Sequence, residues 1–309
     1  MSKRKRLALL LDTWNVDSFT TLTEQFWFIC RTKNLTPKTI DGYAERLEHL
    51  YRWLRERKID LQDVRRIDIQ QYINGLLGTV SDETVNGRIR VYRRFWNVLV
   101  DEELWDKPNP MHKVGLIRAE RKIRPVLSVE QFSHLLAMCT RRSFEGYRNH
   151  LLLLLLWDAM LRLSEVVTFR TEDVNLQEGI IKVRGKGRRQ REVPISPKVQ
   201  KTIHYWLHKH RAGLPGPTLI CKRDGNELTG DRVEKIIAGL GKRAGLKVYP
   251  HLLRHSGASL WVKHGGNSFT LQRVLGHAHI STTQRYVTLD TTALKEAHER
   301  FTPSRDLVW

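Results

Sequence analysis

Six side chains in the second half of this sequence are of the types needed to break a phosphodiester bond without a metal ion. They are two arginines, two histidines, a lysine and a tyrosine: Arg162, Lys186, His251, Arg254, His277 and Tyr286. Two guanidinium groups, each donating paired hydrogen bonds to phosphate oxygens, match a doubly charged transition state. A phenol can attack phosphorus and later leave again, because neighbouring cations lower its pKa from about 10. The set therefore predicts reversible phosphoryl transfer to a tyrosine.

Each of the other five side chains has an expected task in that chemistry. Arg162 and Arg254 are the predicted phosphate-binding guanidiniums. Lys186, between two glycines, is placed to give a proton to the departing 5′ oxygen. His251 is expected to accept the proton of the nucleophile or to donate to the phosphate, and His277 to supply a further donor.

Each residue alone also has an ordinary structural interpretation. Arg162 could pair with Glu165 near a helix end, and Lys186 could simply decorate a hairpin tip. The histidines could cap or solvate helix ends, and Tyr286 could be a half-buried helical aromatic residue. No single position is specific, so the functional interpretation depends on the whole set.

The spacing of these six residues in the sequence is compatible with their meeting at one phosphate. His251 and Arg254 are three residues apart and share one face of a helix. His277 lies nine residues before Tyr286, which leaves room for a turn and a helix start that return the tyrosine to the same phosphate. Expected helix N-termini at Pro250 and near Ser281 would add backbone N–H groups at an anionic site.

The first third of the chain must position these groups on a ligand, and it is predicted to be helical. Apolar residues recur at helical spacing in segments 19–32, 37–54, 66–77 and 82–101, with Thr36-Pro37 and Ser81 as start signals. The last helix carries four arginines within seven residues: Arg88, Arg90, Arg93 and Arg94. They could be a solvated face, but in so basic a chain they are also candidate phosphate contacts.

The second half is predicted to be a mixed domain. Proline-rich residues 105–124 read as a linker, Ser128 starts a helix, and residues 147–167 are strongly helical. Residues 180–183 and 192–195 are predicted strands joined by the basic turn around Lys186, and residues 197–299 are mainly helical. The expected fold class is mainly α with a small β-sheet. The expected organisation is a basic segment 1–17, a helical domain 18–104, the linker, and a catalytic domain 125–309 with a tail helix.

Charge and cysteine content narrow the function classes. The chain has 309 residues, a formal charge of +20 and a pI near 10.1; residues 1–124 carry +7 and residues 125–309 carry +13. Two basic halves suit a polyanion held by two domains. The three cysteines, Cys30, Cys139 and Cys221, form no motif, which favours a reducing cytoplasm. The longest apolar run, 151–157, is too short to cross a bilayer, so no membrane partner is expected.

Taken in order, these motifs resemble the tyrosine recombinases, which include phage and transposon integrases and Xer-like enzymes. The resemblance rests on Leu-Arg-Leu-Ser-Glu (161–165), Gly-Lys-Gly (185–187), Pro-His-Leu-Leu-Arg-His (250–255), Leu-Gly-His (275–277) and Ser-Thr-Thr-Gln-Arg-Tyr (281–286). It implies a SAM-like core-binding domain in the first third and an α+β catalytic domain in the second. It also implies a 3′-phosphotyrosyl intermediate at Tyr286, a free 5′-hydroxyl, and no cofactor, ATP or metal. Glu165 resembles the acidic position that supports the site.

The same resemblance implies the partners. They are double-stranded DNA with a specific core site and a homotetramer that exchanges strands between two duplexes. Two local departures are Met160, where a glycine is common, and Gly257-Ala-Ser259 in place of Phe-Ala-Thr; neither touches one of the chemical groups on this interpretation. The tail helix after Tyr286 could dock on a neighbouring protomer or pack on its own domain.

Two rival functions remain open at this stage. A type IB topoisomerase-like enzyme would use related chemistry without a specific site, and a non-catalytic accessory protein would bind DNA without cutting it. The separate helical domain and the complete chemical set favour recombination over both. The target sequence, the choice between integration, excision and dimer resolution, the host or mobile element, and the need for accessory proteins are not encoded in these motifs.

Overall fold

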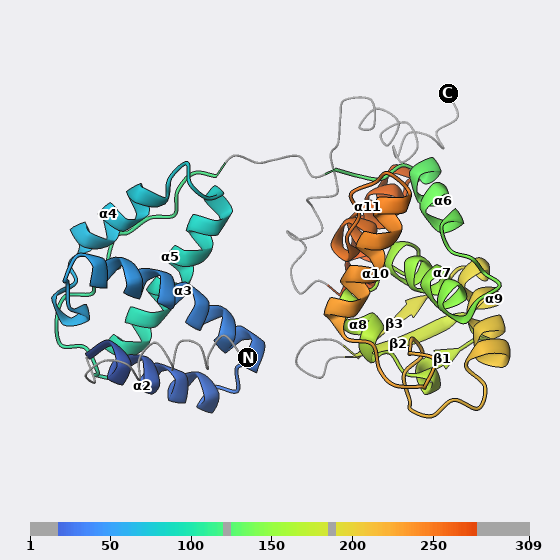
Figure 1. Cartoon of the computed structure of the whole chain (residues 1–309), viewed down its shortest axis with the longest axis horizontal. Helices are drawn as coiled ribbons and strands as arrows, with labels where there is room; N and C mark the ends of the chain where they lie inside the picture. The colour runs from blue at the N-terminus through green and yellow to red at the C-terminus, as the bar shows by residue number, and fades with distance from the viewer. Residues whose placement is uncertain (1–17, 120–124, 185–189, 277–309) are drawn as a thin grey trace, which may run out of the picture. The chain divides into compact units, whose positions relative to one another are not determined.

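The computed structural model describes residues 18–119, 125–184 and 190–276. The chain divides into two compact units, at residues 1–122 and 123–309, shown in Figure 1. The described part of the first unit is helical, and that of the second combines helices with one small sheet. The predicted basic segment 1–17 and the predicted tail helix lie outside the described residues. The mainly helical fold class is confirmed.

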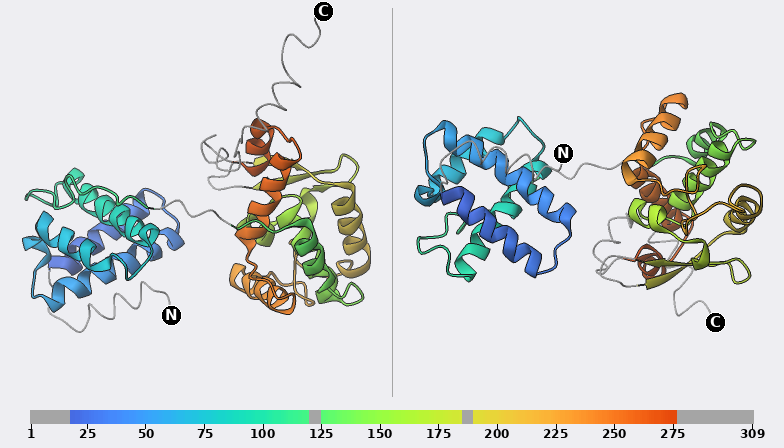
Figure 2. Two further views of the ribbon diagram at one scale, coloured as in Figure 1. Left: turned by 90° about the horizontal axis from the view of Figure 1, so that it is seen from above. Right: turned by 60° about the horizontal axis from the view of Figure 1, so that its bottom comes forward.

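The first unit contains the four helices that the sequence predicts. They are α2 (Ser18–Thr32), α3 (Pro37–Glu56), α4 (Arg66–Leu76) and α5 (Asp82–Asp101), with a 3₁₀ turn η1 (Leu61–Asp63) before α4. The start signals act as expected, because the hydroxyl of Thr36 accepts the N–H of Thr39 and that of Ser81 accepts the N–H of Thr84. Figure 2 shows how these helices cross one another, and their buried apolar side chains form one core.

The described part of the expected linker packs on this first core. Trp105, Met111 and Val114 are buried against it. The Asn86 amide donates to the carbonyl of Ile117 at 3.0 Å and accepts the N–H of Ile117 at 2.9 Å. These contacts hold the described residues 105–117 against the core of the first unit.

The second unit is built around the helix α7 (Phe144–Trp157), whose run of leucines is buried. Its described helices are α6 (Val129–Ala137), α7 (Phe144–Trp157), α8 (Leu163–Thr168), α9 (Pro197–Tyr205), the π-helix η4 (Trp206–His210), α10 (Gly230–Arg243), α11 (Pro250–Lys263) and α12 (Ser268–Leu275). The six leucines 151–156 of α7 are all buried, which explains why the second half of this helix is apolar on every side. α11 packs alongside α7 (Figures 1 and 2).

The prediction of one continuous helix over residues 147–167 is wrong. α7 ends at Trp157, and a new short helix, α8, begins at Leu163. Between them Met160 has φ 49°, a left-handed conformation that an L side chain adopts at a cost. Helical periodicity continues across this break and therefore did not reveal it. The break places Arg162 at the entrance of α8, so it lies near a helix end and pairs with Glu165, as its ordinary structural interpretation expected.

The sheet contains the two predicted strands and one more. β2 (Ile180–Arg184) pairs antiparallel with β3 (Gln190–Pro194), with Lys182 opposite Glu192. A two-residue strand, β1 (Val174–Asn175), pairs with the other edge of β2. It was missed because two residues carry no alternation. The turn that contains Lys186 lies outside the described residues.

Gly257 permits the close contact between α11 and the end of α7. A Cβ atom there would lie 2.0 Å from the carbonyl oxygen of Trp157 and 3.2 Å from the side chain of Met160. Gly257→Ala is therefore expected to reduce the free energy of unfolding by about 1–3 kcal/mol, since backbone must move to admit the methyl group. The same change at Gly239, in α10, where a Cβ would lie more than 4 Å from any side chain or other segment, is expected to stabilise by about 0.5–1 kcal/mol. Urea unfolding of the two variants measures both, and equal effects would contradict the contact.

Candidate active site

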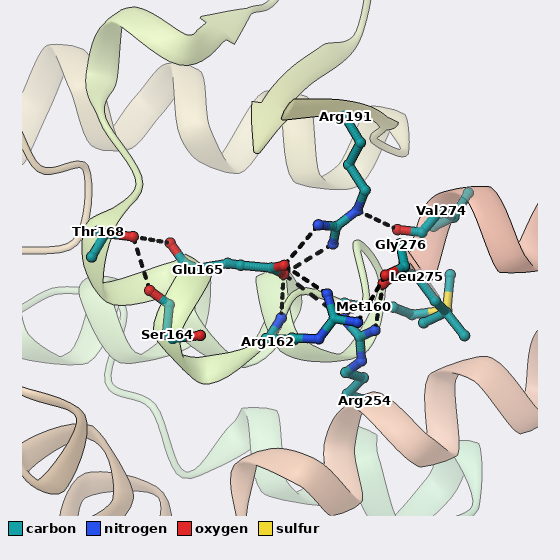
Figure 3. A network of polar contacts seen from close by, with 10 residues as sticks. All are labelled: Met160, Arg162, Ser164, Glu165, Thr168, Arg191, Arg254, Val274, Leu275 and Gly276. Carbon is teal, nitrogen blue, oxygen red and sulfur yellow. Dashed lines mark hydrogen bonds and ion pairs between the residues drawn. The ribbon is translucent and has the colours of Figure 1, made fainter. Parts of the chain in front are cut away.

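Three arginines from different elements surround the carboxylate of Glu165 (Figure 3). Arg162 precedes α8, Arg191 lies on β3 and Arg254 lies on α11. Glu165 stands in the first turn of α8, and only 3% of its side chain is exposed. A buried carboxylate is tolerated only when it is paired and hydrogen-bonded, and these three groups supply that environment.

Arg162 is held by the local geometry of the helix start. The carboxylate of Glu165 accepts the backbone N–H of Arg162 at 2.7 Å and its Nη1 at 2.9 Å. This is one half of a capping box, in which a residue of the first turn accepts the N–H at the entrance of the helix. The guanidinium also donates from Nη2 to the carbonyl oxygen of Gly276 at 3.1 Å. Its side chain remains 38% exposed, so it faces solvent as well as Glu165.

Arg254 is buried, with only 4% of its side chain exposed. Its Nη1 donates to the carbonyl oxygen of Met160, and its Nη2 donates to that of Leu275 at 2.8 Å. Nη1 also lies 3.8 Å from Oε2 of Glu165. Two backbone oxygens from separate segments therefore fix the plane of this guanidinium. The oxygen of Met160 that accepts from Arg254 belongs to the backbone, so a glycine at this position would offer the same acceptor.

The remaining predicted catalytic residues are placed in part. His251 is exposed in the first turn of α11, one turn before Arg254, and α11 starts at Pro250 as predicted. Lys186, His277 and Tyr286 lie outside the described residues, as does the expected helix start near Ser281. The described chain ends at Gly276, the residue before His277 in sequence. The structure thus brings Arg162, Arg254 and Glu165 together and places His251 on the helix of Arg254.

Arg191 belongs to this cluster and was not found by sequence reasoning. Its Nη1 and Nη2 donate to the two oxygens of Glu165 at 2.7 and 2.9 Å, and its Nε donates to the carbonyl oxygen of Val274 at 2.9 Å. Its side chain is 15% exposed. The sequence did contain a signal. Arg191 lies two residues before the buried Val193 on β3, and therefore on the same, inward-facing side of the strand. A charged residue at an inward position indicates a buried partner.

The electrostatic balance of the cluster keeps Glu165 ionised. Burial by itself raises the pKa of this carboxyl, but the hydrogen bonds and charges of Arg191 and Arg162 outweigh it and hold the pKa below its ordinary value. One carboxylate among three guanidiniums leaves an excess of positive charge. Such a centre attracts an anion with several oxygens, and paired N–H donors suit a phosphate.

Glu165→Gln is expected to lower the free energy of unfolding near neutral pH by about 3 kcal/mol, because it leaves three guanidiniums without their carboxylate. The pKa of Glu165 is lower in the folded chain than the unfolded value of about 4.3. Its stabilising contribution is therefore complete above that value and is lost as pH falls through the folded pKa. Urea unfolding at neutral and at acidic pH should show the difference between the two proteins shrinking in acid. A constant difference would contradict this role.

The four arginines of α5 do not form one uniform face. Arg88 donates to the hydroxyl of Tyr72 at 3.1 Å, Arg90 pairs with Glu83 at 3.1 Å, and Arg93 donates to the carbonyl of Val114. Arg94 is exposed. Three of the four thus bond to groups of the folded unit itself. Their assignment to a DNA interface stays a prediction.

Comparisons with known proteins agree with this architecture. The Phage integrase family matches residues 125–292, and the N-terminal SAM-like domain of phage integrases matches residues 24–103. Tyrosine recombinase XerD of Staphylococcus haemolyticus is 30% identical over 92% of this chain and 99% of its own length. Tyrosine recombinase XerC of Bacillus subtilis is 28% identical over 92% of this chain and 96% of its own length.

Solved structures share the fold at lower identity. The Tn1549 transposon integrase in complex with transposon right end DNA aligns with a TM-score of 0.73 at 16% identity, covering 90% of this chain and 98% of that one. The XerH recombinase bound to its difH substrate aligns with a TM-score of 0.70 at 20% identity, covering 96% and 87%.

With both domains and the arginine cluster accounted for, the chain belongs to the phage integrase family, the tyrosine-type site-specific recombinases that its motifs resemble. Among the described helices, none has the length and apolar character needed to cross a membrane.

Proposed function

We propose that this recombinase cuts and rejoins double-stranded DNA at a specific core site through a 3′-phosphotyrosyl bond to Tyr286. The observation that carries the proposal is the convergence of Arg162 and Arg254 beside one buried carboxylate, although 92 residues separate them in sequence. A structural arginine pair gains little from such an arrangement, whereas a phosphate needs two guanidiniums in fixed planes.

In the proposed step, one phosphate ester bond forms as another breaks. Arg162 and Arg254 hydrogen-bond the non-bridging oxygens of the scissile phosphate, and Glu165 keeps the first of them oriented. The phenol oxygen of Tyr286 attacks phosphorus, the P–O5′ bond breaks, and the DNA 3′ phosphate becomes a tyrosyl ester.

Proton transfers complete the step. His251 accepts the phenolic proton or binds the phosphate, while Lys186 protonates the departing 5′ oxygen and His277 adds a donor. Attack by a 5′-hydroxyl of a partner strand reverses each transfer. Energy is conserved in the ester, so the reaction calls for no ATP and no metal.

The proposed partners are DNA and further copies of this chain, four protomers on two duplexes. Support comes from the excess of 20 positive charges and from relatives whose structures hold DNA. One is a lambda integrase dimer bound to a core site, and another is XerH in a post-cleavage complex with palindromic difH. We place the reaction in the cytoplasm, where three unpaired, buried cysteines would stay reduced.

Covalent capture tests the proposal without knowledge of the target. A library of random duplexes, each with a nick that lets the short 5′-ended strand diffuse away, is incubated with the protein. Denaturant-resistant complexes are isolated, their DNA is sequenced, and the modified peptide is identified by mass spectrometry. We expect enrichment of one core motif and a nucleotide on Tyr286. An adduct on another residue, or none on any DNA, would refute the assignment.

The rival activities give different outcomes. A topoisomerase-like enzyme would relax a supercoiled plasmid that lacks the captured motif, whereas the recombinase is expected to leave it supercoiled. An accessory protein would shift duplex DNA in a gel without forming any adduct.

A further inference from the structure

We infer that Arg191 is a positioning residue for cleavage: it neutralises Glu165, so that Arg162 and Arg254 can also bind the phosphate, and it anchors the end of α12. The inference rests on the proposed function and extends it to a residue on β3 that is outside the six chemical positions. Arg191 does not touch the reacting atoms on this view; it acts through Glu165 and through the chain that leads to His277.

The first step concerns how the guanidiniums are divided. All three nitrogens of Arg191 are engaged within the protein, two with the oxygens of Glu165 and one with the carbonyl of Val274. Its side chain is 15% exposed, whereas that of Arg162 is 38% exposed. Arg191 is therefore committed to the carboxylate, and Arg162 keeps a surface open to a ligand.

The second step concerns charge. Glu165 is buried and ionised, and a buried carboxylate that loses its main partner recruits the nearest remaining cations. Those cations are Arg162 at 2.9 Å and Arg254 at 3.8 Å, the two groups assigned to the phosphate. Arg191 donates to both carboxylate oxygens. Arg162 and Arg254 can therefore bind a phosphate while the carboxylate of Glu165 keeps its hydrogen bonds from Arg191.

The third step concerns the end of α12. Three consecutive carbonyl oxygens accept hydrogen bonds from the three different arginines: Val274 from Arg191, Leu275 from Arg254 and Gly276 from Arg162. The last carbonyls of a helix lack intrahelical partners and carry partial negative charge. A phosphate bound by Arg162 and Arg254 must therefore share their donors with two of these carbonyls, whereas the bond from Arg191 to the third is not shared with the phosphate.

Gly276 makes the contact with Arg191 close. A Cβ atom there would lie 2.9–3.1 Å from Cδ, Nε and Cζ of Arg191, and the residue has φ 62°, where glycine is favoured. Figure 3 shows Arg191 reaching from its strand to both Glu165 and the segment 274–276. Arg191 thus links β3, the start of α8 and the residues that immediately precede His277.

Arg191→Met tests the inference because methionine keeps much of the apolar stem and removes the charge and its donors. We expect covalent cleavage of the captured substrate to slow by about 10²-fold, as for a misplaced catalytic group, with DNA affinity within about threefold of wild type. Arg191→Lys restores charge without the paired donors and is expected to give an intermediate rate. Arg223→Met is the matched control, since Arg223 makes a similar two-point contact with Glu145 on the exposed surface. It is expected to cleave at the wild-type rate.

A pH profile and a double variant separate positioning from simple structural support. Without Arg191 the pKa of Glu165 rises, because burial is no longer offset by its strongest partner. The cleavage defect of Arg191→Met should therefore shrink as pH falls and Glu165 becomes neutral. Adding Glu165→Gln to Arg191→Met should recover part of the rate at neutral pH and remove that pH dependence.

The outcomes are separable. Wild-type cleavage rates in Arg191→Met, or a defect that is independent of pH and unrelieved by Glu165→Gln, would overturn the inference while leaving the proposed function standing. Thermal unfolding of each variant shows whether it is folded. If Arg191→Met is not folded, the cleavage rates of Arg191→Lys and of the double variant test the inference instead. Failure of the wild-type chain to form any adduct would instead count against the proposed function.

Discussion

Tyr286→Phe is expected to abolish the covalent protein–DNA complex while leaving DNA affinity nearly unchanged. The substitution removes one oxygen atom, and that oxygen is the proposed nucleophile, so no neighbouring group can replace it at the same position. Binding depends on a formal charge of +20 spread over both halves of the chain, which the substitution does not alter. The measurement is the yield of denaturant-resistant complex on a nicked substrate, alongside a gel-shift titration.

Tyr205→Phe serves as the matched control for this experiment. Tyr205 is exposed at the end of α9 and stacks on Tyr147 with ring centroids 4.8 Å apart, a contact that phenylalanine preserves. It should form the complex at the wild-type rate. Residual adduct in Tyr286→Phe, at a level close to wild type, would show that another residue carries the DNA.

Arg254→Ala is expected to reduce the rate of covalent cleavage by about 10²–10³-fold or more, as for loss of a charge-stabilising donor at a transition state. The guanidinium is buried and its plane is fixed by the carbonyl oxygens of Met160 and Leu275. Such a group requires little reorganisation when charge develops on the phosphate. Single-turnover cleavage on the captured substrate measures the effect.

Because removal of a buried arginine also strands two carbonyls, Arg254→Lys accompanies the alanine variant. Lysine keeps the charge but cannot span both oxygens and the phosphate with a planar fork, so it too should lose most activity. Arg170→Ala is the control, since Arg170 pairs with Glu172 on the surface. Rapid cleavage by Arg254→Ala, within about tenfold of wild type, would remove Arg254 from the transition state.

Local signals in the sequence were sufficient for the helices and their starts. Thr36, Ser81 and Ser128 cap helices as predicted, because a capping hydroxyl acts on an N–H only three residues ahead. The strands β2 and β3 were likewise visible, since alternation needs only a few residues. The family resemblance added the fold of both domains, which composition alone does not specify.

The break between α7 and α8 required the tertiary structure. Met160 adopts a left-handed conformation that no local residue preference favours. The conformation is compatible with the packing of α11, where Gly257 leaves room at the end of α7, and with the bond from Arg254 to the carbonyl of Met160. Partners 94 residues apart in sequence meet there.

The sequence by itself determined which chemistry is available, because residue types and their order identify two guanidiniums, general acids and bases, and a phenol. Only the tertiary structure decided which partners each of the described charged side chains binds. Arg191 contacts Glu165 across 26 residues and Val274 across 83. No periodic pattern records such pairs, because they arise from the packing of a strand against two helix ends. The physical reason is that hydrophobic periodicity encodes which face of an element is buried, whereas the partner of a buried charge is set by where the elements meet.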